Sequence, residues 1–405
     1  MVAAMSVCLN RRSFLRLSVG VASVSLLAAC GGGAAPASTA PSSAPAAASK
    51  PAAPASASAK PAASGSPAAS GAPASKPAAS PASASASVVA APGTQLVRIA
   101  TVGSISDAGF YIADDRGYMK EVGLTPDYQV LNTGPQMVPL LATGQLDVAG
   151  GSVSGALFSA IQRDIPLRIV ADKGSNRPNF VFASIELRKD LVNEVKGFAD
   201  LKGRQVAISA TDNSGQYLVN KVLKSVNLTL KDVDIQTVGY TDQGPAFANK
   251  AIDAGQEIEP FATNWIGKDL AVKMPDQGNV YNNFQAAVLM YGPKFVQDKP
   301  DVGKNLMVAY LKGVRDYNLA FTKGTDKETV IQSLLKHTTV KDRALYDKMG
   351  LPGLNPDGTP IEEDIAAQQD FYVAMGYQKE KLDLKPILDH QFVDYAISQI
   401  GKFNG

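Results

Sequence analysis

The stretch that decides the fold is GSISDAGFYIADDRGYMKEVGL, residues 103–124. A short apolar strand at 97–100 leads into it, and a turn rich in Ser, Gly and Asp is followed by an amphipathic helix. Asp107 can cap the first N–H groups of this helix, and Gly123 suits a left-handed C-terminal cap. A loop at the carboxyl end of a strand that opens onto a helix presents fixed backbone donors. We therefore expect one wall of a small-molecule cleft here, although an ordinary strand-to-helix turn has the same pattern.

Three further loops follow short apolar strands in the same way. They span residues 132–135, 150–154 and 211–215 and consist mainly of Ser, Thr, Asn, Asp and Gly. Repeated strand–loop–helix units predict parallel sheets with helices on both faces. Because the carboxyl ends of parallel strands meet at one edge, these loops are expected to gather where open α/β sheets bind small molecules.

The second half of the folded part repeats the pattern of the first half. Leu-Asp-Val at 146–148 and Ile-Asp-Ala at 252–254 occupy matching places, so Asp147 and Asp253 are expected to be structural. Beyond the second unit the pattern is largely helical, notably over 302–321. This long helical part indicates that the chain crosses back to the first lobe.

Composition limits the chemistry that the chain can perform. The 405 residues carry a net charge of +2 without a strongly basic domain, which argues against nucleic acid as a partner. The two cysteines, Cys8 and Cys30, lie near the N-terminus, and the two histidines are His337 and His390. A metal site built from His or Cys and a cysteine nucleophile are therefore not expected. We expect no catalytic residue, no metal and no cofactor.

Residues 1–30 are typical of a bacterial export signal. Asn-Arg-Arg-Ser-Phe-Leu-Arg at 10–16 resembles the twin-arginine motif, although paired arginines also occur in ordinary secretory signals. An apolar run at 17–29 precedes Cys30, and Leu-Ala-Ala-Cys-Gly at 27–31 resembles a lipobox. We expect Cys30 to become the first residue and to carry a lipid, rather than to be a small buried hydrophobic residue.

Residues 31–92 are expected to form a disordered tether. Up to Ala90 this segment is almost wholly Ala, Pro, Ser and Gly. It cannot bury enough apolar surface to offset the conformational entropy of the chain, and its frequent Pro opposes an Ala-rich helix. The tether would join a lipid at Cys30 to a globular body.

A family resemblance rests on four blocks of sequence. In their order and spacing these blocks resemble the lipoprotein solute-binding proteins of bacterial ABC importers, in the branch that carries nitrate, taurine, alkanesulfonates and thiamine-pyrimidine precursors. The resemblance covers about residues 96–330 and departs at Lys250, where Gly is usual, and at Ile258, where an aromatic residue is common. The blocks are Phe-Tyr-Ile-Ala at 110–113 with Gly-Tyr at 117–118 and Val-Gly-Leu at 122–124, LLATGQLDV at 140–148, Asp-Leu-Lys-Gly at 200–203 with Val-Ala at 206–207, and Ile-Asp-Ala at 252–254 with Glu-Pro at 259–260.

The resemblance implies a two-lobe, periplasmic-binding-protein-like (type II) α/β fold. Each lobe is then a mostly parallel sheet flanked by helices, and two crossovers join the lobes. The first part of lobe 1 would span 93–183, lobe 2 would span 184–285, and 286–405 would return to lobe 1 and add the C-terminal helices. A ligand that bridges the lobes favours the closed state, which a permease recognises. The implied partners are an ABC permease and ATPase, and the chain would be a monomer held by its lipid at the extracytoplasmic face of the cell membrane.

The cleft loops contain no Arg or Lys and are bordered by aromatic residues, so an anion is not the favoured ligand. Aromatic faces stack on flat rings, while amides and carboxylates bind ring N–H and hydroxyl groups. A neutral or weakly cationic heteroaromatic vitamin is therefore expected, with riboflavin preferred over a pyrimidine precursor of thiamine. The predicted ligand-binding residues are Ser106, Asp107, Phe110, Tyr111, Asn132, Thr133, Ser152, Ser154, Asn179, Asp212, Asn213, Ser214, Tyr217, Tyr240 and Glu257.

Three other functions share much of this pattern. A sulfonate-, taurine- or nitrate-binding protein needs cations or aimed N–H groups in the cleft. A pyrimidine-forming enzyme, as in fungal relatives of this fold, needs a His and a Schiff-base Lys there with bound pyridoxal phosphate, whereas His337 and His390 lie in the C-terminal helical part. A ligand-sensing or adhesion lipoprotein without a transporter has the same sequence features as an importer component.

Overall fold

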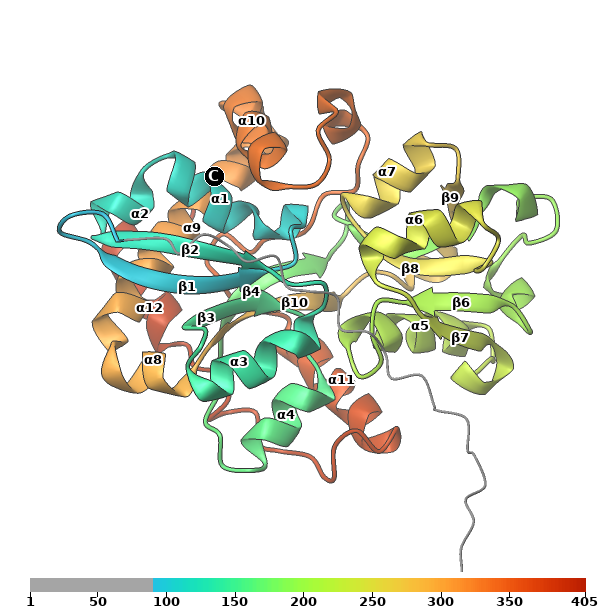
Figure 1. Cartoon of the computed structure of the whole chain (residues 1–405), viewed down its shortest axis with the longest axis horizontal. Helices are drawn as coiled ribbons and strands as arrows, with labels where there is room; N and C mark the ends of the chain where they lie inside the picture. Colours follow the sequence, from blue (N-terminus) through green and yellow to red (C-terminus); the bar gives the residue numbers. More distant parts are fainter. Residues whose placement is uncertain (1–89) are drawn as a thin grey trace, which may run out of the picture. The chain divides into compact units, whose positions relative to one another are not determined.

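The computed structural model describes residues 90–405, which are arranged around two β-sheets (Figure 1). The export signal, the lipobox at Cys30 and residues 31–89 of the predicted tether lie outside the described residues. Among residues 90–405, no helix combines the length and the apolar character needed to cross a membrane.

The first sheet has five strands in the order β2-β1-β3-β10-β4. Strand β1 runs parallel to β2 and β3, whereas β10 runs antiparallel to β3 and β4, so the sheet is mixed. The chain therefore returns to the first sheet after it has built the second one. The strands are β1 (Gln95–Thr101), β2 (Leu124–Val130), β3 (Val148–Gly151), β4 (Arg168–Asn176) and β10 (Phe284–Tyr291).

The second sheet repeats this plan with the order β7-β6-β8-β5-β9. Strand β6 is parallel to β7 and β8, and β5 is antiparallel to β8 and β9. We call the first sheet with its helices lobe 1 and the second lobe 2; the lobe boundaries at 183/184 and 285/286 stay a prediction. The strands are β5 (Ala183–Arg188), β6 (Gln205–Ile208), β7 (Asp234–Thr237), β8 (Ala254–Ile258) and β9 (Ala271–Lys273).

Helices cover both faces of the lobe 1 sheet (Figure 1). Side chains alternate along β1, so that Val97 and Ile99 join the core under α1, α9 and α12, whereas Ala100 joins the core under α3 and α4. The helices of lobe 1 are α1 (Ala108–Asp115), α2 (Tyr118–Glu121), α3 (Met137–Thr143), α4 (Gly155–Ile161), α8 (Pro293–Asp298), α9 (Pro300–Lys323), α10 (Lys327–His337) and α12 (Gln391–Ile400).

Lobe 2 carries α5 (Ser214–Ser225), α6 (Tyr240–Ala248) and α7 (Phe261–Gly267). Helix α11 (Glu362–Ala374) contacts α4, α5 and β10, so it links the two lobes. Short 3-10 turns lie at Ile105–Asp107, Gly134–Gln136, Lys189–Leu191, Phe198–Leu201, Leu230–Asp232, Gln277–Asn279 and Arg343–Asp347.

The helix predicted after Asp107 is divided in two, which corrects the expectation of one continuous helix. Helix α1 ends at Asp115, and Gly117 takes a left-handed conformation with φ 80° before α2 begins. Gly123 has φ 75°, as expected of a left-handed cap. The Asp107 carboxylate does not cap α1; it accepts the backbone N–H of Ser104 at 2.9 Å and so closes the preceding 3-10 turn.

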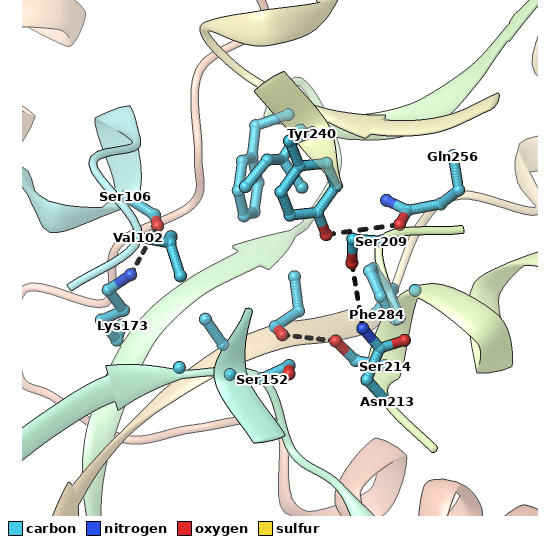
Figure 2. A pocket seen from close by; sticks show the side chains of 17 residues that line it. Val102, Ser106, Ser152, Lys173, Ser209, Asn213, Ser214, Tyr240, Gln256 and Phe284 are labelled. Atoms are coloured by element: carbon cyan, nitrogen blue, oxygen red, sulfur yellow. Dashed lines mark hydrogen bonds between the residues drawn. The ribbon is translucent and has the colours of Figure 1, made fainter. Parts of the chain in front are cut away.

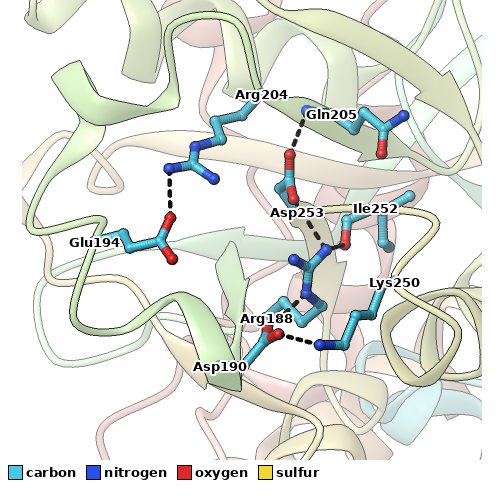
Figure 3. A network of polar contacts seen from close by, with 8 residues as sticks. All are labelled: Arg188, Asp190, Glu194, Arg204, Gln205, Lys250, Ile252 and Asp253. Carbon is cyan, nitrogen blue, oxygen red and sulfur yellow. Dashed lines mark hydrogen bonds and ion pairs between the residues drawn. The ribbon is translucent and has the colours of Figure 1, made fainter. Parts of the chain in front are cut away.

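The predicted repeat of the first half of the folded part in the second half is seen in two aspartates that make equivalent hydrogen bonds, one in each lobe. The backbone N–H of Arg98 in β1 donates to Asp147 Oδ2 at 2.9 Å, and the backbone N–H of Gln205 in β6 donates to Asp253 Oδ2 at 3.0 Å. Each carboxylate, just before β3 or β8, thus fastens the start of that central strand to the neighbouring parallel strand, β1 or β6. Figure 3 shows the lobe 2 version, in which Arg188 also donates to Asp253, at 2.9 Å. Both aspartates are structural, as predicted.

Candidate ligand-binding pocket

One pocket lies between the loops of the two lobes, at the carboxyl ends of their parallel strands. Lobe 1 contributes residues after β1, β2 and β3, and lobe 2 contributes residues after β6 and β7 (Figure 2). The wall is completed by side chains from within β4, β8 and β10. The lining residues are Val102, Ser106, Gly134, Gly151, Ser152, Lys173, Phe182, Ser209, Asn213, Ser214, Gly215, Tyr240, Gln256, Ile258, Phe284, Ala286 and Ala287.

The N-terminus of α5 forms the polar end of the lobe 2 wall. Asn213 is the N-cap of this helix, and its Oδ1 accepts the backbone N–H of Gln216 at 2.9 Å. Its Nδ2 donates to Ser209 Oγ at 3.1 Å, while Ser214 Oγ donates to the carbonyl oxygen of Ala286 at 2.6 Å. These bonds hold amide and hydroxyl groups in fixed positions facing the pocket, as Figure 2 shows.

Three aromatic rings give the pocket its apolar surface. Tyr240 stacks on Phe261 with ring centroids 5.7 Å apart and an interplanar angle of 16°, and its hydroxyl lies 3.4 Å from Gln256 Oε1. Burial raises the pKa of Tyr240 to about 12, so the phenol keeps its proton at neutral pH and can donate it in a hydrogen bond. Phe182 and Phe284 supply the other two rings.

A buried ion pair lies at the lobe 1 side of the pocket. Lys173 Nζ is 2.6 Å from Asp107 Oδ1 and donates to Ser106 Oγ at 3.0 Å, and neither charged side chain is exposed. The cleft loops contain no Lys or Arg, but Lys173 reaches the pocket from within β4, so the pocket has a cation that the loop residues did not indicate. A lysine inside an otherwise buried strand was the sequence signal for it, because lysine is rarely buried without a partner.

The cavity is small and the lobes meet around it. It encloses about 30 Å³, enough for roughly one or two water molecules, whereas pockets for drug-sized ligands measure on the order of 300–1,000 Å³. Next to it, Ser154 and Asn213 form an antiparallel bridge between the lobes. A ligand of ordinary size therefore requires that the lobes separate before they close on it.

The structure brings five of the predicted site residues to this pocket, namely Ser106, Ser152, Asn213, Ser214 and Tyr240. Asp107 lies behind them as the partner of Lys173. Four others lie beside the pocket without lining it: Thr133 precedes the lining residue Gly134, Ser154 caps α4, Asp212 precedes Asn213, and the exposed Asn132 follows β2.

The remaining predicted residues lie elsewhere. Phe110 and Tyr111 are buried in the core of lobe 1: the Phe110 and Tyr310 ring centroids are 4.8 Å apart, and Tyr111 stacks on His337 at 4.7 Å. They face helices rather than the pocket because α1 packs closely on α9. Asn179 is exposed in the turn between β4 and β5, and Tyr217 is buried against α11, where its hydroxyl donates to Asp364 at 3.2 Å.

Glu257 is buried on the opposite face of β8 from the pocket. Its neighbours Gln256 and Ile258 line the pocket, and side chains alternate along a strand. Neither carboxyl oxygen has a hydrogen-bond partner within the described residues, and burial, followed by the nearby Glu186, raises the pKa of Glu257 well above its ordinary value. Burial of this carboxyl inside lobe 2 thus favours its protonated form.

Sequence reasoning missed every lining residue that lies inside a strand and some that lie in loops. Tyr240 and the Ser/Asn loops were found because turn residues after apolar strands are a local signal. The missed residues are Val102, Gly134, Gly151, Lys173, Phe182, Ser209, Gly215, Gln256, Ile258, Phe284, Ala286 and Ala287.

The protein has the two-lobe periplasmic-binding-protein (type II) α/β fold, as predicted. Its features are two mixed sheets, a chain that passes from one sheet to the other and back, and a pocket between the lobes. Residues 105–318 match the NMT1/THI5-like family model, and the chain belongs to this family. No curated protein sequence matches the chain.

Solved structures with this fold are similar over most of their length. The periplasmic nitrate-binding protein NrtA from Synechocystis PCC 6803 aligns with a TM-score of 0.63 and 13% identity, over 77% of this chain and 90% of its own. The alkanesulfonate-binding protein SsuA from Xanthomonas axonopodis pv. citri, bound to MOPS, aligns with a TM-score of 0.59 and 16% identity, over 75% of this chain and 100% of its own. A point mutant of DszB in complex with biphenyl-2-sulfinic acid aligns with a TM-score of 0.52 and 15% identity, over 75% of this chain and 99% of its own. At these identities the similarity shows the fold alone.

Proposed function

We propose that the protein is the extracytoplasmic substrate-binding component of an ABC importer and not an enzyme. The observation that carries this proposal is a pocket to which both lobes contribute hydroxyl, amide and aromatic groups. A ligand held by Ser106 and Ser152 on one side and by Asn213 and Tyr240 on the other stabilises the closed arrangement. A permease that recognises this closed form then couples binding to import.

The ligand that fits best is a neutral or weakly cationic heteroaromatic vitamin. The rings of Tyr240, Phe182 and Phe284 offer faces for a flat ring, and Asn213 and Gln256 offer both donors and acceptors. Because Asp107 balances Lys173, the pocket carries no net charge from this pair. Riboflavin is our preferred ligand, since its ring and its polyol match the aromatic and hydroxyl groups, and a pyrimidine precursor of thiamine is the next.

A second candidate is a sulfonate, taurine or nitrate, and one observation favours it. The ammonium group of Lys173 lies at the pocket, and the N-terminus of α5 presents a favourable dipole to an anion. NrtA and SsuA have the same fold and are, respectively, a nitrate-binding and an alkanesulfonate-binding protein. The ion pair with Asp107 weighs against an anion here, because the ammonium already has a negative partner.

The histidines lie away from the pocket, which weighs against the pyrimidine-forming enzyme. His337 stacks on Tyr111 and contacts Asp115 at 3.2 Å, and His390 contacts Glu362 at 3.1 Å. Lys173 is the one lysine that lines the pocket among the described residues, and its ammonium is engaged by Asp107. No histidine lines the pocket among the described residues, so a reaction that consumes a histidine lacks this reactant here.

The membrane attachment rests on the N-terminal sequence. We propose that Cys30 carries a lipid, such as a diacylglyceryl group with a further palmitate, and that the segment up to residue 92 acts as a tether. The protein then works as a monomer at the outer face of the cell membrane, beside its permease and ATPase. Replacing Cys30 with Ser releases the protein from washed membranes if this anchoring is correct.

Calorimetric titration of the purified full-length chain tests the ligand class. We expect saturable binding of riboflavin or of a thiamine pyrimidine precursor, and none of taurine or nitrate. Tight binding of taurine or nitrate without any binding of the ring compounds would reject the vitamin proposal. Loss of high-affinity riboflavin uptake on deletion of the gene in its host, restored by the intact gene, tests the role in import.

A further inference from the structure

The buried pair of Lys173 and Asp107 is built into the wall of the pocket. Both side chains have an exposed fraction of 0%, and charged groups of this kind are almost never fully buried unless they are paired. The ammonium has two contacts within the described residues, Asp107 Oδ1 at 2.6 Å and Ser106 Oγ at 3.0 Å. An ammonium group has three N–H donors; within the described residues the bond to Ser106 uses one, and the contact with Asp107 is an ion pair, so a donor remains for a group in the pocket.

The surrounding backbone is shaped to let the lysine reach this position. A Cβ atom on Gly150 of β3 would lie 2.8 Å from Cε of Lys173, which is closer than packed atoms approach. The absence of a side chain at Gly150 therefore leaves room for the lysine stem across β3. The partner carboxylate is also held in place, because Asp107 Oδ2 accepts the backbone N–H of Ser104 at 2.9 Å.

We propose that this pair sets the charge of the ligand, with Asp107 occupying the place beside Lys173 Nζ that an anionic ligand group would otherwise take. The inference rests on the proposed role of the pocket in ligand binding, and it adds Lys173 and Asp107 as the residues that determine specificity. A neutral ligand accepts the free ammonium N–H with a carbonyl or ring nitrogen and leaves the pair intact. An anionic ligand brings a second negative charge against one ammonium group whose side chain is fully buried, and this is unfavourable.

The proposal predicts that the pocket gains affinity for anions when the carboxylate of Asp107 is removed. Asp107→Asn has nearly the same shape but leaves Lys173 without a negative partner, so an anion from solution should take its place. We expect the full-length variant to bind nitrate and ethanesulfonate at least tenfold more tightly than the wild type, in calorimetric titrations at low ionic strength. Ser106→Ala is the matched control, since it removes a contact of the same ammonium without changing any charge and should not create anion binding.

A buried unpaired lysine can prevent folding, so a second variant and a second readout accompany the first. In Asp107→Asn, nitrate or ethanesulfonate should raise the midpoint of thermal unfolding with increasing concentration, because a bound anion stabilises the folded state. The double variant Asp107→Asn with Lys173→Gln carries no charge at this place. It should fold, and neither anion should bind it or raise its midpoint.

The outcomes separate this inference from the proposed vitamin ligand. If Asp107→Asn folds but binds no anion, or if no anion stabilises it, the inference fails whatever the natural ligand is. Tight binding of nitrate or ethanesulfonate by the wild type overturns both ideas. If the wild type binds neither riboflavin nor a pyrimidine while Asp107→Asn gains anion binding, the vitamin proposal fails and the charge-setting role of the pair stands.

Discussion

The Oδ1 atom of Asp212 in lobe 2 accepts a hydrogen bond of 2.6 Å from the backbone N–H of Gly155 in lobe 1. Gly155 is the first residue of α4, and a Cβ atom there would lie only 2.2 Å from this oxygen. The carboxylate therefore depends on a glycine to approach the start of the helix. This contact joins the two lobes beside the pocket and breaks when they separate.

Asp212→Asn should stabilise the closed protein at neutral pH. Burial raises the pKa of Asp212 from 3.8 to about 6, although the N–H groups of Gly155 and Ala156 act in the opposite direction. The folded state therefore binds the proton more tightly than the unfolded state, so its stability falls as the pH rises from about 4 to about 6. The asparagine oxygen can still accept the Gly155 N–H, and it has no charge to bury.

Urea unfolding of wild type and Asp212→Asn at a series of pH values measures this effect. The variant should gain stability relative to the wild type between pH 4 and pH 6, and the difference should stay constant above that range. Asn also tolerates the left-handed backbone at this position, where φ is 61°. A difference that does not change with pH would show that the carboxylate is not desolvated by lobe closure.

Tyr240→Ala should weaken binding of a ring-shaped ligand by about tenfold, since an aromatic contact contributes roughly 0.5–1.5 kcal/mol. The reason is that the Tyr240 ring lines the pocket and is held in place by Phe261. Tyr240→Phe keeps the ring and loses the hydroxyl, which contacts Gln256 and Ser209, so its affinity should stay within about threefold. Calorimetric titration measures both, and equal affinities of Tyr240→Ala and wild type would exclude stacking on this ring.

Lys250→Gly should raise the free energy of unfolding by up to about 1 kcal/mol, because the left-handed conformation strains any residue with a Cβ atom. Lys250 has φ 58°, a backbone conformation that Gly adopts without strain. The side chain forms a surface ion pair with Asp190 at 2.8 Å, and such pairs stabilise little. Lys250→Ala removes the ion pair but keeps the strain, so in urea unfolding it should be less stable than Lys250→Gly. The opposite order would contradict the strain argument.

Gly313→Ala should destabilise lobe 1 by about 3 kcal/mol, at the upper end of the range for overpacking. Gly313 lies in α9, and a Cβ atom there would be 2.2 Å from the carbonyl oxygen of Gly109 and 2.9 Å from the backbone nitrogen of Ala113. Both are backbone atoms of α1, which cannot move aside as a flexible side chain can. In an exposed helix the same substitution would stabilise by roughly 0.5–1 kcal/mol.

Thermal or urea unfolding shows directly whether Gly313→Ala stabilises or destabilises the protein. Thr322→Ala, at an exposed position of the same helix, is the control and should change stability by less than about 0.5 kcal/mol. A stabilising effect of Gly313→Ala would mean that α1 and α9 do not approach each other this closely in solution.

The candidate pocket was predicted well where its residues belong to turns and poorly where they belong to strands or helix faces. Asn213 and Ser152 follow apolar strands in Ser- and Asn-rich loops, and this local pattern placed them at the correct sheet edge. Phe110 follows the same kind of loop, yet it faces α9, whose residues lie about two hundred positions later. Which side of α1 packs inward depends on that distant helix, so the local pattern could not decide it.

The amino-acid sequence by itself determined the alternation of strands and helices, the loops that end the strands, and the repeat marked by Asp147 and Asp253. Periodicity, caps and turn residues depend on neighbours a few positions apart, so they can be recognised locally. Only the tertiary structure decided the charge and shape of the pocket. Lys173 and Ser106 are 67 positions apart, and Asp212 and Gly155 are 57 positions apart. Such pairs meet only because the mixed sheets bring distant strands together, and no local pattern records which partners meet.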